Sequence, residues 1–270
     1  MPISNANGTP VYYEVHGDGF PVLLVTGMAN VLDWFHFTIP VLAEEFKVVA
    51  QDLRGSNREG VGPAPGPYTT AEMALDSIGI LDGLGIEKAH VVGLSMGGMI
   101  AQHLAISHQD RVAKVAIVGN GLARTPREIA DAALAQDQGS DVARLHTHDL
   151  TEDQKLQMAL QLIFTPGFAE AKPDRYSFFL DLHNNHGPHP ETHQAQVMAA
   201  IKHDTLDDLH KITAPVQLLV GELDHINGGL AHEMAERIPN CDFRVLPGMA
   251  HGLTIEHAEE FNQLLLDFLR

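Results

Sequence analysis

Residues 89–106 read AHVVGLSMGGMIAQHLAI. The run Ala89–Leu94 is mostly apolar and is typical of a buried strand, while Met96–Ile106 has the spacing of a helix. Between them, residues 93–97 match G-x-S-x-G, a turn so tight that the positions two before and two after the serine must lack side-chain bulk. Both positions are glycine, so we predict that the turn raises the Ser95 hydroxyl above a sheet edge as a nucleophile. The alternative is a glycine-rich strand–helix turn that carries a serine by chance.

Apolar runs alternate with helical patterns on either side of this segment. A strand that helices cover on both faces reads as a continuous apolar run, as residues 21–26 (PVLLVT) do. The alternation predicts the α/β class, with a mostly parallel central sheet flanked by helices. Besides the segments above, we expect a hairpin turn at Asn7-Gly8, strands over 10–16, 21–26, 47–51, 112–118, 215–220 and 243–246, and helices over 33–45, 69–85 and 258–269.

The alternation is interrupted once, between Gly121 and Thr213. This stretch has helical patterns but no convincing strand, and a structureless loop of that length is implausible in a compact domain. We therefore predict an α/β core of residues 1–120 and 214–270 and a helical cap of residues 121–213. Because ligands bind at the carboxyl edge of such sheets, a cap over that edge would form the wall of a pocket. The expected cap helices cover 125–138, 151–164, 174–182 and 193–203.

The composition excludes several classes of protein. Acidic residues number 35 and basic ones 17, for a net charge of −18, which argues against nucleic acid or an anionic membrane as partner. The one cysteine, Cys241, excludes an intramolecular disulfide and a cysteine-based metal cage. The N-terminal residues lack the pattern of a signal peptide, and no apolar run approaches the roughly 18 residues of a membrane span. We expect a soluble cytoplasmic protein that acts on a small molecule; the sequence does not indicate its oligomeric state.

A serine nucleophile needs a base and an acid, and in this architecture the acid precedes the base along the chain. His251 lies in a loop just after the last expected strand, and Asp224 lies just after the preceding one. Both therefore follow neighbouring strands, at the edge that carries Ser95. We predict that His251 accepts the Ser95 proton and that Asp224 orients and stabilises the imidazole. Glu222 is the reserve candidate for the acid, whereas Asn120, which follows another strand, cannot serve as one.

Acyl transfer also needs donors for the oxyanion that develops on the substrate, each worth about 3–4 kcal/mol. One donor is the backbone N–H of the residue after the nucleophile, Met96. The other comes from the loop after an early strand, and Met28 occupies that place in Thr26-Gly27-Met28. We therefore predict an oxyanion hole formed by the N–H groups of Met28 and Met96. The alternative is that Gly27 only ends a strand.

These residues together resemble the α/β-hydrolase superfamily, and the resemblance covers residues 10–120 and 213–270. The segments that look most like 3-oxoadipate enol-lactonases and related small esterases are 66–69 (GPYT), 81–105 (LDGLGIEKAHVVGLSMGGMIAQHLA) and 111–112. The family's His-Gly-x oxyanion motif falls on residues 26–28, with threonine in place of histidine. Its Asp-x-Arg-Gly turn falls on residues 52–55, and Ser56-Asn57-Arg58 follow where the family has small residues.

The resemblance and the triad together predict a cofactor-free serine hydrolase that cleaves a carboxylic ester or lactone through an acyl-enzyme. Relatives with an aspartate nucleophile are dehalogenases or epoxide hydrolases, and Ser95 excludes that chemistry. Two alternatives remain open. One is a carbon–carbon hydrolase of vinylogous or β-diketone substrates that uses the same triad, and the other is a ligand-binding protein on a hydrolase scaffold.

Two residues are candidates for the substrate pocket, Trp34 and His183. For Trp34, which follows the oxyanion loop, an ordinary core position is the alternative. His183 belongs to a group of four histidines in the predicted cap, with His186, His189 and His193. Glycine and proline between them break any helix that could present them on one face, so we expect a polar loop near the pocket rather than a metal site.

Overall fold

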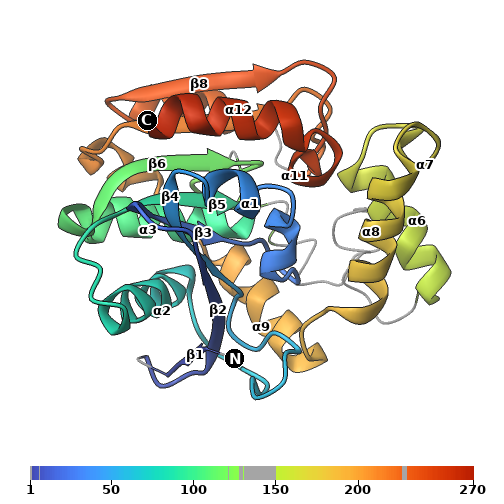
Figure 1. Ribbon diagram of the computed structural model, residues 1–270, viewed down its shortest axis with the longest axis horizontal. Coiled ribbons are helices and arrows are strands. Elements are labelled where there is room, and N and C mark those ends of the chain that lie inside the picture. Colours follow the sequence, from blue (N-terminus) through green and yellow to red (C-terminus); the bar gives the residue numbers. More distant parts are fainter. Residues whose placement is uncertain (1, 6, 121, 128–129, 131–149, 227–229) are drawn as a thin grey trace.

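The computed structural model describes residues 2–5, 7–120, 122–127, 130, 150–226 and 230–270. Its centre is an eight-stranded sheet in the order β1-β2-β4-β3-β5-β6-β7-β8 (Figure 1). β2 pairs antiparallel with β1 and with β4, and all other pairs are parallel, which confirms the predicted hairpin and sheet. The strands are β1 (Ile3–Ser4), β2 (Val11–His16), β3 (Phe20–Val25), β4 (Phe46–Gln51), β5 (Ala89–Leu94), β6 (Val112–Val118), β7 (Val216–Gly221) and β8 (Cys241–Leu246).

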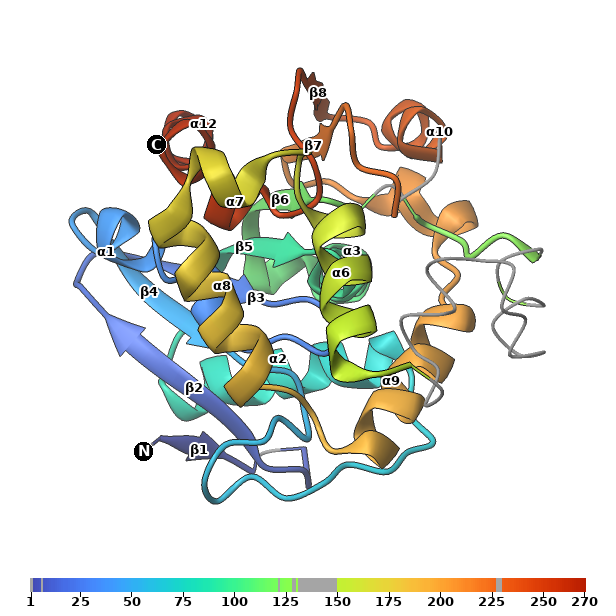
Figure 2. The same ribbon diagram turned by 90° about the vertical axis from the view of Figure 1, so that its right-hand side faces the viewer.

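Helices cover both faces of this sheet (Figure 2). On one face pack α2 (Thr70–Gly83), α3 (Met96–Ser107) and α10 (Ala231–Arg237); on the other pack α1 (Ile39–Leu42) and α12 (Ala258–Leu269). Because successive side chains of a strand point to opposite faces, Leu23 joins the first apolar core and Leu24 the second, and both are fully buried. This double coverage is the reason that the central strands are apolar at nearly every position.

The prediction of one helix over residues 33–45 is wrong. The structure has a short 3₁₀ helix, η1 (Leu32–Phe35), and then α1, which begins just before Pro40. Proline has no N–H and its ring clashes with the preceding turn, so it fits the first turn of a helix but not the interior of a longer one. The carboxylate of Asp52 also accepts the Leu32 N–H at 2.6 Å, which fixes the start of η1.

The described part of the segment between β6 and β7 is mostly helical. It contains α6 (Glu152–Ile163), α7 (Phe168–Ala171), α8 (Pro173–Asn185), α9 (Pro190–Ile201) and the 3₁₀ helix η3 (Leu206–Lys211). We call α6–α9 the inserted helices. Three of the four helices predicted there are present with shifted ends, while the fourth, over 125–138, falls mostly outside the described residues. In Figure 1, α6–α8 lie on the side to which the arrowheads of β6 and β8 point.

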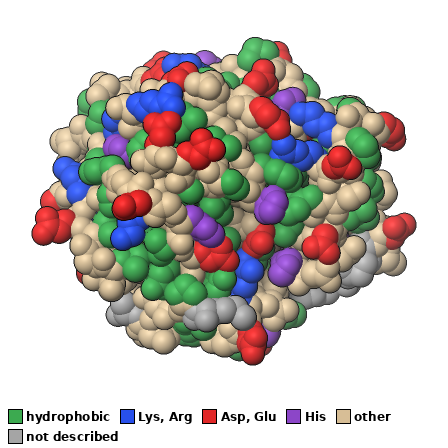
Figure 3. Space-filling model, viewed as in Figure 1, with side chains coloured by type: hydrophobic (Ala, Val, Ile, Leu, Met, Phe, Trp, Pro, Cys, Tyr) green, Lys and Arg blue, Asp and Glu red, His purple; other side chains and the backbone are tan. Residues whose placement is uncertain are grey.

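The surface and the helix lengths bear on possible partners. None of the described helices combines the length and the apolar character needed to cross a membrane. On the face shown in Figure 3, Lys and Arg side chains are scattered among acidic ones rather than gathered in one area. That face therefore lacks the cluster of positive charge to which nucleic acid binds, and the net charge of the chain is −18.

Candidate active site

Ser95 occupies the turn between β5 and α3 with a backbone φ of +53° and ψ of −117°. A Cβ atom added at Gly93 would lie 2.2 Å from the carbonyl oxygen of Gly97, and one added at Gly97 would lie 2.1 Å from that of Val25. Neither distance is possible for a real side chain, so the turn requires glycine at both positions. The Ser95 N–H donates to the carbonyl of Val118 at 2.8 Å, which fastens the turn to the end of β6.

Asn120 holds the same turn from the other side. Its Nδ2 donates to the Ser95 carbonyl at 2.8 Å, and its Oδ1 accepts the Leu122 N–H at 2.9 Å. A positive φ in a residue with a Cβ costs about 1–2 kcal/mol, so the strained serine needs such fixed partners. From the sequence, Asn120 is only a residue that cannot act as the acid, and the signal for its supporting role is an amide, rather than a carboxylate, after β6.

Asp224 and His251 form a buried pair. The His251 Nδ1 lies 2.8 Å from Asp224 Oδ2, and the two side chains are 8% and 1% exposed. Asp224 follows β7 and His251 follows β8, and the Leu223 N–H donates to the Met249 carbonyl at 2.8 Å, which ties their two loops together. The reserve acid, Glu222, accepts the Gly248 N–H at 2.9 Å. Of the two carboxylates, Asp224 is therefore the one in contact with the imidazole.

The end of β6 links this pair to Ser95. The Val118 carbonyl binds the Ser95 N–H, and the next residue, Gly119, lies against the imidazole. A Cβ at Gly119 would be 3.3 Å from His251 Nδ1 and 3.7 Å from Asp224 Oδ2. Ser95 and His251 thus contact two successive residues of one strand end, and the structure brings all three predicted triad residues to the same sheet edge.

The loop after β3 lies beside the serine. A Cβ at Gly27 would be 3.1 Å from the Cβ of Ser95, so glycine is needed there for close approach. Within the described part of the chain, neither the Met28 N–H nor the Met96 N–H donates to a protein acceptor. The next donor along, the Ala29 N–H, is bound by the Gln196 side chain. Two backbone donors are therefore left for a ligand beside Ser95.

Trp34 and His183 belong to one aromatic cluster. The ring of Phe179 lies 6.1 Å from that of Trp34 and 5.8 Å from that of His183, and Phe164 lies 6.5 Å from Trp34. Trp34 is buried in this cluster, which joins η1 to α6 and α8. The cluster reaches the loop of His251, because a Cβ at Gly252 would lie 2.5 Å from the Phe164 ring, and the Gly252 N–H donates to the Ile163 carbonyl at 2.6 Å.

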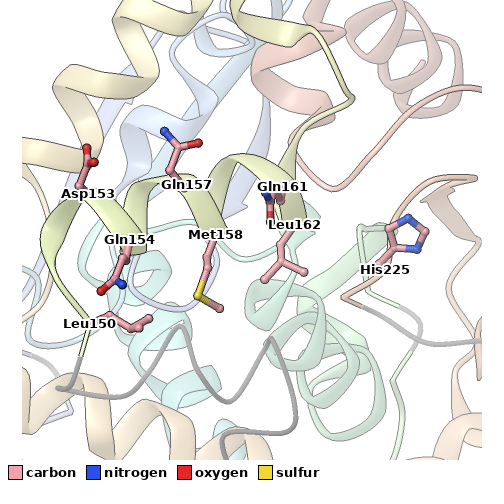
Figure 4. Close-up of a pocket in the computed structure, with 8 residues that line it drawn as sticks. All are labelled: Leu150, Asp153, Gln154, Gln157, Met158, Gln161, Leu162 and His225. Carbon is pink, nitrogen blue, oxygen red and sulfur yellow. The ribbon is translucent and has the colours of Figure 1, made fainter.

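A cavity of about 500 Å³ lies between α6 and the residue that follows Asp224. His225 lies across from the α6 side chains in Figure 4. The wall of this cavity combines apolar side chains with the amide groups of three glutamines. It is lined by Leu150, Asp153, Gln154, Gln157, Met158, Gln161, Leu162 and His225.

The histidines and the cysteine were also considered as metal ligands or nucleophiles. Among the described residues, no three His, Cys, Asp or Glu side chains are grouped as a metal site requires. His186 ends α8 and His189 precedes α9, so they belong to the turn between these helices. Burial raises the pKa of the Cys241 thiol to about 11, and the neighbouring Asp242 adds to this, so the thiolate is disfavoured.

The fold and this edge agree with a known family. The sequence model of the alpha/beta hydrolase fold family matches residues 21–258, and the chain belongs to that family. It is a hydrolase, as its relatives are. A candidate carbamate hydrolase, RutD, from Caulobacter sp. (strain K31) is 30% identical over 96% of this chain and 95% of its own length. The 2-hydroxymuconate semialdehyde hydrolase of Pseudomonas putida is 30% identical over 94% of this chain and 88% of its own.

Solved structures show the same fold over nearly the whole chain. An enol-lactonase from Burkholderia xenovorans LB400 superposes with a TM-score of 0.83 over 99% of both chains, at 24% identity. A thermophilic esterase from Thermogutta terrifontis superposes with a TM-score of 0.82 over 97% of this chain and 93% of its own, at 26% identity. The superfamily expected from the sequence is thereby confirmed, whereas identity at this level does not fix a substrate.

Proposed function

We propose that this hydrolase is a cofactor-free serine hydrolase that cleaves a carboxylic ester or lactone of a small molecule. The observation that carries the proposal is the buried Asp224–His251 pair, which contacts Gly119 while the preceding residue binds the backbone of Ser95. A serine on a strained turn, beside an imidazole held by a carboxylate, has the parts of a nucleophile, a base and an orienting acid.

The reaction follows from these positions. Ser95 Oγ attacks the substrate carbonyl carbon while His251 Nε2 takes the hydroxyl proton, and the oxygen that becomes negative accepts the N–H groups of Met28 and Met96. Collapse of this intermediate breaks the carbon–oxygen bond, and His251 gives its proton to the leaving alkoxide. Water, deprotonated by His251, then attacks the acyl-enzyme. The carboxylic acid leaves and the proton returns to Ser95.

The inserted helices would then act as a cap, residues 121–213, over a core of residues 1–120 and 214–270. Their place at the carboxyl edge of the strands, with a cavity between α6 and His225, supports this division. The amide groups of Gln154, Gln157 and Gln161 suit a substrate with polar groups beyond its reacting carbonyl.

Two other substrate classes have a specific observation in their favour. The likeness to the 2-hydroxymuconate semialdehyde hydrolase favours carbon–carbon cleavage, and the likeness to RutD favours a carbamate. Both reactions begin with a carbonyl in the same oxyanion hole and differ in the leaving group. Without turnover of any class, the third candidate is a ligand-binding protein on this scaffold.

The experiment that tests the proposal measures products from four substrate classes: short-chain esters, lactones, carbamates and vinylogous or β-diketones. Ser95→Ala is compared with Ser107→Ala, which changes an exposed serine at the end of α3. We expect esters or lactones to react fastest, with kcat at least about 10³-fold lower in Ser95→Ala and unchanged in Ser107→Ala. Full activity in Ser95→Ala would contradict the serine mechanism, and faster turnover of another class would replace the ester or lactone.

A further inference from the structure

Gln196 connects the inserted helices to the loop beside Ser95. It lies on α9 and is 2% exposed. Its Oε1 accepts the Ala29 N–H at 2.9 Å, and its Nε2 donates to the Arg54 carbonyl at 3.3 Å. A single side-chain amide therefore bridges two core loops that are far from it in the sequence.

The bound residue, Ala29, is strained. Its φ of +60° is in the left-handed region, which a residue with a Cβ adopts at a cost of about 1–2 kcal/mol. Ala29 directly follows Met28, whose N–H is left for a ligand. The hydrogen bond to Gln196 sets the orientation of the peptide between them, and it also occupies the Ala29 N–H, which would otherwise compete as a donor.

The other end of the bridge is fixed. The Arg54 guanidinium forms a buried ion pair with Asp76, with nitrogen–oxygen distances of 2.6 and 2.8 Å. The Arg54 carbonyl is therefore part of a rigid turn. Because Gln196 binds both this turn and the Ala29 N–H, it holds the oxyanion loop at a fixed distance from the turn. Hydrogen bonds around a catalytic group commonly have this supporting role.

Gln196 is not the only residue of α9 that binds the core. One turn earlier, Thr192 Oγ1 accepts the Ala64 N–H at 2.9 Å, and the Thr192 carbonyl accepts the Tyr68 hydroxyl at 3.3 Å. A Cβ at Gly55 would lie 2.4 Å from the Thr192 side chain, which shows how closely helix and loop approach. Loss of the Gln196 amide would thus leave the helix docked and the Ala29 N–H without its acceptor.

We propose that Gln196 is a positioning residue of the oxyanion hole, so that α9 contributes to the rate of the reaction and not only to substrate selection. This inference rests on the proposed function, since it assigns Met28 N–H to the oxyanion. It predicts an effect on the transition state, which bears the negative charge, and little effect on the neutral bound substrate.

The test compares Gln196→Met, which keeps the size and removes both hydrogen bonds, with Thr192→Val, which removes a buried hydrogen bond of the same helix away from the oxyanion loop. In Gln196→Met, kcat should fall about 10- to 100-fold with KM within about threefold of wild type. The affinity for an alkyl boronic acid, which forms a negatively charged tetrahedral adduct with the serine, should fall in parallel. Thr192→Val should keep the kcat and boronate affinity of the wild type, while its melting temperature should fall about as much as that of Gln196→Met.

Wild-type kcat and boronate affinity in Gln196→Met, or equal losses in Thr192→Val, would overturn the proposal. If the methionine variant does not fold, Gln196→Asn takes its place, because an amide one methylene shorter cannot reach both partners and the same losses are expected. Failure of the proposed function is seen separately, as a wild-type protein that neither turns over a substrate in a Ser95-dependent way nor binds the boronate.

Discussion

Gly119 leaves room for the imidazole of His251: a Cβ at this glycine would lie only 3.3 Å from both Nδ1 and Cε1 of the ring. Gly119 has a φ of +54°, so its backbone is also in a region that favours glycine. The end of β6 therefore forms one wall of the place where the ring lies. This close approach also explains why a residue with no side-chain chemistry bears on the Asp224–His251 pair.

Gly119→Ala is expected to lower kcat by about tenfold or more, because the added methyl displaces the ring from its position against Asp224. It should also lower the free energy of unfolding by about 1–2 kcal/mol through backbone strain. Gly85→Ala is the matched control, since Gly85 has a φ of +66° but open space where the methyl would lie. Kinetics and urea unfolding of both variants check the prediction, which fails if Gly85→Ala loses as much activity.

Asp224→Asn should lower kcat by about 10⁴-fold with the fold intact, because an amide neither holds the required imidazole tautomer nor stabilises the imidazolium. Glu222→Gln should stay within about threefold of wild type, since the hydrogen bond that Glu222 makes within the described residues is to the Gly248 N–H. Steady-state kinetics on the best substrate distinguish the two carboxylates. The reverse order of effects would transfer the role of the acid to Glu222.

Asn120→Asp is expected to destabilise the protein by about 1–3 kcal/mol. The new carboxylate keeps the acceptor for the Leu122 N–H but loses the donor to the Ser95 carbonyl and repels that oxygen. The strained turn then loses one of its fixed partners, so kcat should fall as well. Urea unfolding and kinetics test this, and a variant with unchanged stability would show that Asn120 does not hold the turn.

Acid should destabilise the protein through His203. Burial lowers the pKa of His203 to about 3, and the nearby His103 adds to this. In the unfolded chain a histidine has a pKa of about 6.5. Between about pH 3 and about pH 6.5, the unfolded state therefore binds a proton that the folded state does not. The contribution of the neutral buried ring to the free energy of unfolding is complete above about pH 6.5. It decreases as the pH falls toward about 3, by up to about 1.4 kcal/mol per pH unit.

Urea unfolding at about pH 7 and about pH 4.5 measures this slope. His203→Gln should make the dependence shallower, whereas His210→Gln, at an exposed position, should leave it unchanged. Burial also lowers the pKa of His103, so a residual slope of the same sign is expected in His203→Gln. Equal slopes in the wild type and His203→Gln would contradict the assignment.

The features that could be predicted from the sequence are those that leave a local trace. The serine turn was predictable because Gly93 and Gly97 are the residue type that its geometry requires, and the approach of Asp224 to His251 because each follows a strand that the sequence indicates. The prediction of one helix over 33–45 was wrong because the apolar spacing continues through Pro40. The missing N–H of this proline does not allow an uninterrupted helix there.

The supporting contacts could not be predicted because they are polar pairs distant in sequence. Gln196 and Ala29 are 167 positions apart, and a glutamine on a helix has no motif that indicates a buried partner. The same holds for Asn120. Its amide donates to the Ser95 carbonyl, as a carboxylate could not, but the sequence does not show that this carbonyl lies within reach. Such contacts depend on how helices and loops pack together, and the apolar periodicity of a single segment does not predict them.

The inserted helices are attached to the core by different sets of contacts. α9 is joined by the buried hydrogen bonds of Thr192 and Gln196, whereas the α6–α8 side combines the rings of Phe164 and Phe179 against Trp34 with hydrogen bonds to Glu256. Apolar contacts tolerate exchange for residues of similar volume, while a buried amide bridge tolerates almost no exchange. The ring positions of the α6–α8 side are therefore freer to diverge than Gln196, and a designer could repack those rings while leaving α9 untouched.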